Sequence, residues 1–372
     1  MGYLNASLEG VTTIRAFKTE KILRDEFDRH QDLYSSAYYI LVSSMRAFAF
    51  TMDTLCGFYI SFKVLRFLII DNDILAGHVG LAISQAFSLT GTLQWGIRQW
   101  AEIENRMTSV ERVLEYTEIK QENKQGLELE SWPKQGEVKY DNVYLTYTNS
   151  NEYVLKNINF TANPREKIGI VGRTGAGKSS IISTLFRLYD VEGKISIDGT
   201  ETKTLSLDYL RANISIIPQD PVLFTGSIRD NIDPTRRYTD DEIWKAIHCS
   251  HLKNLVPSLD FEIVEAGSNF SIGQRQLICL ARATVQNNKI IVLDEATANM
   301  DPETDELIHQ TIRENFRDCT VFTVAHKLNS ILHSDRVMVL DKGEIIEFDK
   351  PGTLLQNKDG VFYKMVAKAG LV

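Results

Sequence analysis

The sequence predicts an all-α segment of long helices, followed by a domain of mixed α/β structure. Three observations lead to this prediction. All eight prolines lie at or after Pro133, so no proline interrupts a helix before that point. Residues 74–97 contain no Asp, Glu, Lys or Arg. A glycine-rich turn at 172–179 stands between a short apolar run and a helical pattern, in the order strand, loop, helix.

Composition limits the classes of function. The 372 residues are 43% hydrophobic and 24% charged, which is enough apolar material for the cores of two or three domains. The net charge is 41 − 49 = −8, which argues against a surface that coats nucleic acid. The four cysteines lie far apart and form no C-x-x-C pair, so we expect reduced thiols rather than a metal centre.

Three regions follow from these patterns. Residues 1–118 form the helical part, with a cytoplasmic helical extension on each side of two candidate membrane spans. Residues 119–135 are polar and turn-rich, which favours a linker. Residues 136–372 form the α/β domain.

The candidate membrane spans are 46–70 and 74–97. The second has no charge over its length, which is enough to cross roughly 30 Å of hydrocarbon. Four charged side chains interrupt the first, namely Arg46, Asp53, Lys63 and Arg66. That segment could equally be a helix of a soluble bundle. Basic residues flank the pair and none lies in the acidic turn 71–73, so we expect a membrane hairpin with both flanks in the cytoplasm.

Charged residues inside a membrane are costly and commonly line a solute path. Trp95 and Arg98 are three residues apart on a predicted helix, and together with Arg46 they could present cations and a ring to an anionic solute. The alternatives are arginines that reach the interface and a tryptophan of the aromatic belt.

The segment "GRTGAGKSS" predicts a P-loop NTPase domain that binds ATP and Mg²⁺. It matches G-x-x-x-x-G-K-[ST] after a strand and before a helix. Glycines let backbone amides approach the phosphates, Lys178 reaches the β- and γ-phosphates, and the Ser179 hydroxyl coordinates Mg²⁺. The predicted nucleotide-binding residues here are Gly172, Thr174, Gly175, Ala176, Gly177, Lys178, Ser179 and Ser180.

The apolar run 290–293 predicts a buried parallel strand that ends in Asp294 and Glu295. In a P-loop fold the carboxyl end of such a strand faces the nucleotide. Asp294 would then hold Mg²⁺ through water, and Glu295 could polarise the attacking water.

A second anion site is predicted at "SNFSIGQRQLICLARA" (268–283). Ser271 stands at an N-cap position, Gly273 leaves the first-turn amides accessible, and an apolar stripe that includes Ile272 follows. The P-loop already provides one helix N-terminus for the phosphates. The simplest arrangement therefore places this second helix on the nucleotide of a partner domain, so that two domains enclose two nucleotides.

The motifs resemble those of ATP-binding cassette (ABC) transporters. The P-loop, "IIPQDPVLF", "FSIGQ", "LDEATANMD" and "TVAHKL" occur in the order typical of a cassette domain. The finer resemblance is to the second cassette of the subfamily C exporters, the multidrug resistance-associated proteins. "LEGVTTIRAF" and "SVERVLEYTE" resemble the last part of their membrane domain, so the resemblance covers nearly the whole chain.

The resemblance implies roles that the residue types alone do not. Tyr147 would stack on adenine, where the sequence by itself suggests a strand aromatic of the core. Gln219 would bind Mg²⁺, sense the γ-phosphate and contact the membrane domain. His326 would contact the γ-phosphate and hold Glu295 and water. Asp301 would belong to a loop that crosses to the partner domain.

The same resemblance assigns the signature that faces the partner's ATP to Ser271, Gly273 and Gln274. Phe270 and Ile272 depart from the common Leu-Ser-Gly-Gly-Gln pattern, although the backbone donors remain. In this subfamily the second signature completes a slow site, so the Glu295 site would be the active one. It would need the signature of a first cassette.

These expectations describe the C-terminal portion of a multi-pass exporter of amphipathic organic anions (conjugates, cyclic nucleotides and drugs). The protein would lie in the plasma membrane with its cassette in the cytoplasm. Its partners would be a first nucleotide-binding domain, the remaining transmembrane helices, the lipid and the organic anion, with no nucleic acid. The chain should not transport alone. The alternatives are an ATP-gated channel or channel regulator of the subfamily, and a soluble cassette ATPase acting on nucleic acid, which 74–97 and the acidic balance disfavour.

Overall fold

The structure is a computed structural model that describes residues 2–69, 76–147, 152–253, 255–296, 302–325 and 328–371. The chain forms two compact units, Met1–Gln121 and Glu122–Val372. The predicted site residues His326 and Asp301 lie outside the described residues.

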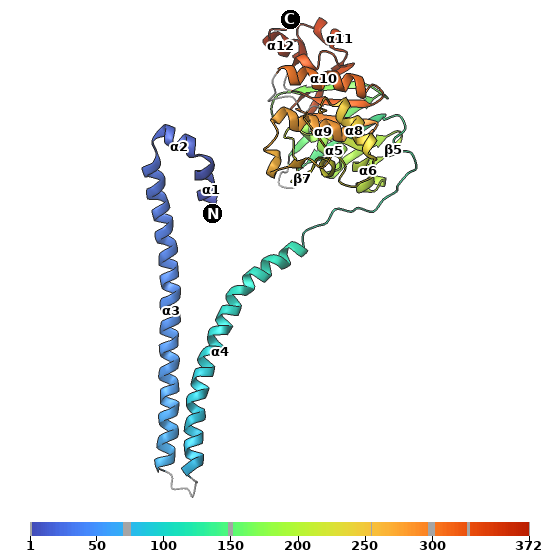
Figure 1. The fold of residues 1–372 in the computed structure, drawn as a ribbon. Coiled ribbons are helices and arrows are strands. Elements are labelled where there is room, and N and C mark those ends of the chain that lie inside the picture. Colours follow the sequence, from blue (N-terminus) through green and yellow to red (C-terminus); the bar gives the residue numbers. More distant parts are fainter. Residues whose placement is uncertain are drawn as a thin grey trace. The chain divides into compact units, whose positions relative to one another are not determined.

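Helices are the only regular elements in the described part of the first unit, which agrees with the predicted fold class. Two short helices, α1 (Gly2–Glu9) and α2 (Val11–Phe17), precede the long helices α3 (Glu20–Ile69) and α4 (Ala76–Thr117). The two long helices pack against each other and run antiparallel (Figure 1). At 1.5 Å per residue α3 is about 75 Å long, so it exceeds the hydrocarbon thickness of a bilayer by a wide margin.

The ranking of the two membrane candidates differs from the expectation. Among the described residues, α3 alone combines the length and apolar composition needed to cross a membrane. The 74–97 segment, expected to be the stronger candidate, supplies a helix that begins at Ala76 and does not meet that standard. The physical reason is that the segment lacks charge but contains His, Gln, Ser, Thr and Gly, which contribute little apolar surface.

The second unit has two main sheets. In the antiparallel sheet the strand order is β2-β1-β4-β5, and in the six-stranded sheet it is β12-β11-β3-β10-β9-β6. The strands of the first sheet are β1 (Val138–Thr146), β2 (Tyr153–Ala162), β4 (Val191–Ile197) and β5 (Thr200–Glu201). Those of the second are β3 (Lys167–Gly172), β6 (Ile214–Ile217), β9 (Ile290–Asp294), β10 (Thr320–Val324), β11 (Arg336–Asp341) and β12 (Glu344–Asp349). A short ribbon pairs β7 (Gly226–Ser227) with β8 (Glu262–Ile263).

Helices and short 3₁₀ turns connect these strands. The α-helices are α5 (Lys178–Leu185), α6 (Leu207–Ala212), α7 (Ile228–Ile232), α8 (Asp240–Cys249), α9 (Ile272–Gln286), α10 (Pro302–Asn315), α11 (Pro351–Gln356) and α12 (Val361–Lys368). The five strands from β11 to β6 in the second sheet run parallel, so their carboxyl ends lie at one edge. This edge is where ligands bind in open α/β sheets.

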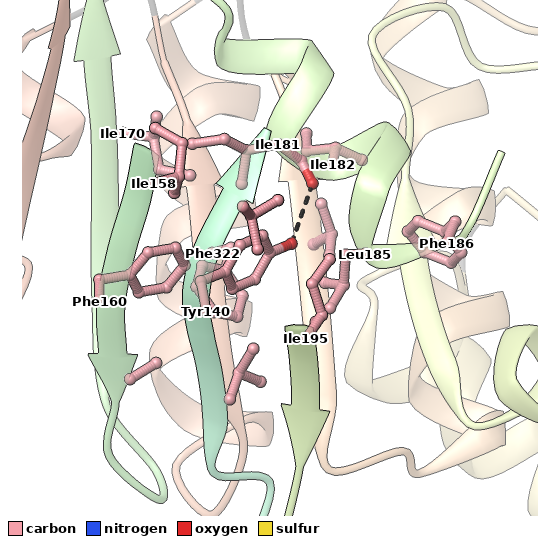
Figure 2. Close-up of a cluster of buried hydrophobic side chains, with 14 of the residues drawn as sticks. Tyr140, Ile158, Phe160, Ile170, Ile181, Ile182, Leu185, Phe186, Ile195 and Phe322 are labelled. Atoms are coloured by element: carbon pink, nitrogen blue, oxygen red, sulfur yellow. Dashed lines mark hydrogen bonds between the residues drawn. The ribbon is translucent and has the colours of Figure 1, made fainter. Parts of the chain in front are cut away.

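A buried core joins the two sheets to α5, the helix that follows the P-loop. In Figure 2 the ring of Tyr140 lies between Phe160 and the residues of α5. The Tyr140 and Phe160 rings stack at 4.5 Å between centroids, and Phe160 meets Phe322 edge to face. The Tyr140 hydroxyl lies 3.3 Å from the Ile181 carbonyl, to which it donates. These contacts hold α5 in place beneath the phosphate loop.

Residues 122–135, which we name the entry segment, are part of the second unit and pack against it, although the sequence favoured a linker there. Trp132 is buried, and its indole N–H donates to the Ile197 carbonyl at 3.2 Å. Arg211 makes a two-bond ion pair with Glu122 at 2.7 Å for each bond. One large aromatic and one arginine pair thus attach a segment whose overall composition is polar.

The C-terminal helix α12 is capped by a side chain from β12. The backbone N–H groups of Val361 and Phe362 donate to the two carboxylate oxygens of Glu347 at 2.8 and 2.9 Å. Gly360 occupies the N-cap and supplies no side-chain bond, so Glu347 takes over the role of the cap. Phe362 and Val366 then bury the helix against β11 and its neighbours.

Replacing Glu347 by Ala is therefore expected to lower the free energy of unfolding by about 1–2 kcal/mol, because two amides lose their acceptor and the helix dipole loses its anion. Chemical denaturation measures this loss, and hydrogen exchange should show faster exchange of the Val361 and Phe362 amides. Glu344→Ala on the same strand is the control, since Glu344 is exposed, and it should stay within about 0.5 kcal/mol. Unchanged amide protection in the Glu347 variant would contradict the capping role.

Candidate nucleotide site

The loop between β3 and α5 has the backbone geometry that a phosphate cradle needs. Gly175 and Gly177 have φ angles of +81° and +101°, in the region that side chains disfavour. Gly177 is the N-cap of α5 and makes no side-chain cap bond. The first amides of α5 therefore face the loop, with the positive end of the helix dipole behind them.

Lys178 is held inside this loop. Its side chain is only 6% exposed, and Nζ donates to the Gly172 carbonyl at 3.1 Å. The ammonium group of Lys178 is thus hydrogen-bonded to the first residue of the loop that Lys178 ends. Ser179 lies exposed in the first turn of α5, next to this cation in sequence.

Asp294 and Glu295 stand at the end of β9, whose preceding four residues are buried. Burial raises the pKa of the Asp294 carboxyl, the Glu295 carboxylate raises it further, and Lys178 opposes both effects. The Asp294 Oδ1 atom is buried without a hydrogen-bond partner among the described residues. Glu295 has a φ angle of +48°, and its N–H donates to the Val324 carbonyl at 2.9 Å. Such a conformation is uncommon for a residue other than glycine.

Strand register brings the predicted groups to one edge of the sheet. Val324 of β10 is the partner of Ile170 on β3 and of Asp294 on β9. On the other side of β9, Leu293 pairs with Ile217 of β6, and Gln219 follows two residues later in an exposed position. The P-loop, the Asp294–Glu295 pair and Gln219 therefore follow β3, β9 and β6 at the same edge of the sheet, with β10 between β3 and β9.

This set of groups fits ATP with Mg²⁺. The amides of α5 and the Lys178 ammonium are donors for phosphate oxygens. The Asp294 oxygen without a partner and the exposed Ser179 hydroxyl are the hard oxygen ligands that Mg²⁺ prefers. A buried carboxylate with an open oxygen is costly unless a cation or donor satisfies it, which favours a metal at this point.

Tyr147 follows β1 and reaches the helix after the P-loop. Its hydroxyl lies 2.8 Å from the Ser180 Oγ. Its ring meets the ring of Tyr189 edge to face, with 4.7 Å between centroids and 81° between planes. Tyr147 is half-buried at the margin of the core, so it is neither a fully buried strand aromatic nor free of contacts.

The predicted second anion site begins a well-capped helix. Ser271 is the N-cap of α9: its N–H donates to the Gln274 side chain at 2.9 Å, and the Gln274 N–H donates to Ser271 Oγ at 3.2 Å. Because Oγ accepts in this capping box, the hydroxyl proton of the exposed Ser271 can still be donated to an anion. Two details differ from the expectation: Ile272 is 46% exposed instead of joining the apolar stripe, and Gly273 is buried. The first turn of α9 places Gly273 inward and turns Ile272 outward.

In the helical unit, a groove of about 330 Å³ between α3 and α4 is lined by both Arg46 and Arg98. Apolar side chains make most of its wall, namely Leu41, Val42, Met45, Phe48, Met52 and Ile97. Trp95, which we expected to share the face of Arg98, is not among the lining residues and is 66% exposed.

Comparisons with known proteins agree with this geometry. The ABC transporter family matches residues 155–298, which include the P-loop, the α9 start and the Asp294–Glu295 pair. The chain is similar to the ATP-binding cassette sub-family C member 4 of Mus musculus, with 49% identity over 99% of this chain and 28% of that protein. The Homo sapiens protein of the same name matches to the same extent.

Residues 155–298 of this chain form an ABC transporter domain.

Two further relatives support the family. A probable multidrug resistance-associated protein of Drosophila melanogaster is 48% identical over 99% of this chain and 28% of its own length. A solved bacterial Atm1-family ABC exporter with ATP bound matches with a TM-score of 0.82 and 26% identity, over 99% of this chain and 66% of that one. This ABC chain therefore spans about 28% of the length of the curated relatives named here.

Family membership confirms two expectations in their general form. The second unit is an ABC cassette, an ATPase domain that binds nucleotide, and the helical unit belongs to a membrane protein. The resemblance of the motifs to subfamily C, and within it to member 4, is confirmed by the relatives that match. The roles of the individual site residues remain predictions.

Two features of this ABC chain were not predicted from its sequence. Tyr189 was not predicted to lie near the site, although "RLYD" places an aromatic just after the P-loop helix. The bond between Tyr147 and Ser180 joins residues 33 positions apart, and no local pattern predicts it.

Proposed function

We propose that this chain supplies one cassette and one helical pair of an ATP-driven exporter of amphipathic organic anions. The observation that carries the proposal is the single sheet edge at which the P-loop, Asp294, Glu295 and Gln219 meet, with one Asp294 oxygen open to a cation. ATP and Mg²⁺ would bind there.

Each group at this edge has a role that its chemistry supports. Lys178 and the α5 amides stabilise charge on the phosphates, while Ser179, Asp294 and Gln219 hold Mg²⁺, in part through water. Glu295 orients the attacking water and accepts its proton. His326 and Asp301 belong to this proposal from the family resemblance, and Tyr147 would stack on adenine.

The α9 start supports a head-to-tail pair of cassettes. Ser271 is exposed, the helix is 15 residues long, and its hydroxyl proton is available to an anion. Since α5 already supplies a helix N-terminus to the chain's own nucleotide, Ser271, Gly273 and Gln274 would contact the nucleotide of a first cassette. That cassette would in turn complete the Glu295 site, and the remaining transmembrane helices of the exporter would complete the membrane domain.

The groove between α3 and α4 supports the anionic substrate class. Two guanidinium groups, Arg46 and Arg98, lie in one mostly apolar groove, which suits a molecule with an acidic group and a hydrophobic body. Conjugates, cyclic nucleotides and acidic drugs have this character. We place the protein in the plasma membrane, with its cassette in the cytoplasm, because the basic flanks of the helical pair favour that side.

Transport into inverted vesicles tests this proposal. An exporter in which this chain replaces the matching segment of a sub-family C relative should accumulate a fluorescent organic anion with ATP. Arg98→Ala should raise KM for the anion by about tenfold or more, because a charge-assisted contact is lost. Arg106→Ala is the control on the same helix, since Arg106 is exposed and its ion-pair partner among the described residues is Glu102.

Two outcomes would contradict the proposal. One is the absence of ATP-dependent accumulation by the unmodified chimera. The other is an ATP-gated current without net flux of the anion, which would favour the channel or channel-regulator alternative of the same subfamily.

A further inference from the structure

The ring of Tyr189 contacts the ring of Tyr147, the residue that would stack on adenine. The proposed function above gives Tyr189 no role. The two rings meet edge to face at 4.7 Å and 81°. We propose that Tyr189 is a positioning residue that sets the ring plane of Tyr147 and thereby strengthens recognition of the base. This inference rests on the proposed function, in which Tyr147 stacks on adenine.

The hydrogen bond of Tyr147 cannot set that plane alone. The hydroxyl oxygen lies on the long axis of the ring, so its 2.8 Å contact with Ser180 Oγ fixes the end of the side chain but not rotation about that axis. Rotation about this axis is a soft torsion in tyrosine. A second contact to the side of the ring is needed to select one orientation, and Tyr189 supplies it.

The turn that carries Tyr189 is firmly held. The guanidinium groups of Arg187 and Arg211 donate hydrogen bonds to backbone carbonyls within and beside it. Their acceptors are Thr202 and Leu205 for Arg187, at 2.9 and 2.8 Å, and Phe186 and Arg187 for Arg211, at 3.0 and 3.1 Å. These bonds fix the backbone of the turn from which the Tyr189 ring, 41% exposed, meets the ring of Tyr147.

An edge-to-face contact occupies at most one face of Tyr147 and leaves the other face for a base. The expected arrangement is a row of base, Tyr147 and Tyr189. Because Ser180 and Tyr189 lie within and just after the helix that begins at the P-loop, the base and the phosphates are bound by parts of one rigid element. Loss of Tyr189 should therefore weaken contacts to the base and spare those to the phosphates.

The inference is tested by comparing the binding of ATP with the binding of tripolyphosphate, which has the phosphates but no nucleoside. The full chain in lipid nanodiscs is titrated with Mg-ATP and with Mg-tripolyphosphate, and Kd is measured by calorimetry. Tyr189→Ala should raise Kd for ATP by roughly three- to tenfold, the range that an aromatic pair contributes, and change Kd for tripolyphosphate by less than about twofold. Tyr189→Phe should keep wild-type affinity, because the edge-to-face contact does not need the hydroxyl.

Matched variants separate this inference from the proposed function. Leu188→Ala removes an exposed neighbour in the same turn and should change neither Kd. Tyr189→Ala should add no further loss in a Tyr147→Ala background. If Tyr147→Ala weakens ATP binding and Tyr189→Ala does not, the inference is overturned while the adenine stack stands. If Tyr189→Ala weakens both ligands equally, Tyr189 supports the P-loop helix rather than the base, which also overturns the inference. If Tyr147→Ala leaves ATP binding unchanged, the adenine stack itself is wrong.

Discussion

Replacing Glu295 by Gln is expected to slow ATP hydrolysis by about 100- to 1,000-fold, because general-base catalysis of the attack by water is lost. The amide keeps the shape of the carboxylate but cannot accept the proton of water. Glu295 stands directly after Asp294 at the end of β9, in a left-handed backbone conformation tied to β10 through the Val324 carbonyl. That position places its side chain at the nucleotide edge without making it the buried metal ligand.

ATP binding should survive the same change. Removal of one negative charge near the phosphates leaves Lys178, the α5 amides and Asp294 in place, so Kd for Mg-ATP should stay within about threefold or fall. Hydrolysis is measured by phosphate release and binding by calorimetry. Glu344→Gln is the matched control, since Glu344 is exposed on β12, and it should affect neither quantity. Equal loss of binding and hydrolysis in Glu295→Gln would show that Glu295 supports the fold of the site instead of the chemistry.

The positions of the P-loop and of the Asp294–Glu295 pair could be predicted because each depends on local sequence. The P-loop needs left-handed glycines at fixed spacing before a helix, and Gly175 and Gly177 provide them. A buried parallel strand places whatever follows it at the carboxyl edge of the sheet, so an apolar run ending in Asp294 and Glu295 was sufficient. The capping of α9 by Ser271 and Gln274 follows from their spacing of three residues.

Other features depend on contacts between distant segments. One example is the contact of Tyr147 with Ser180 and Tyr189, which forms because β1 packs on α5. The spacing of these residues along the chain does not predict that packing. The entry segment has a linker composition, yet the buried Trp132 and the ion pair of Glu122 with Arg211 attach it to the rest of the cassette.

In the helical unit, the spacing of residues along α4 was not sufficient to predict which side chains line the groove. Residues three apart on a helix are separated by about 60° around its axis. The groove between α3 and α4 admits Arg98 together with Gln94, Ile97 and Ala101, while Trp95 falls on the neighbouring face. Similarly, the described part of 74–97 lacks charge but is less apolar than the best 18-residue window within α3, although α3 carries many charged side chains outside that window.

The central claim is that this cassette is one half of a two-cassette ATPase, in which each half completes the other's site. The most direct test is the rate of ATP hydrolysis by the full chain in nanodiscs, alone and with a first cassette domain of a sub-family C exporter. The account predicts a low rate that depends on concentration for the chain alone. Addition of the first cassette should raise that rate by about tenfold or more, since its signature supplies donors to the transition state, and Glu295→Gln should abolish the gain. A full rate from the chain alone, independent of its concentration, would contradict the account.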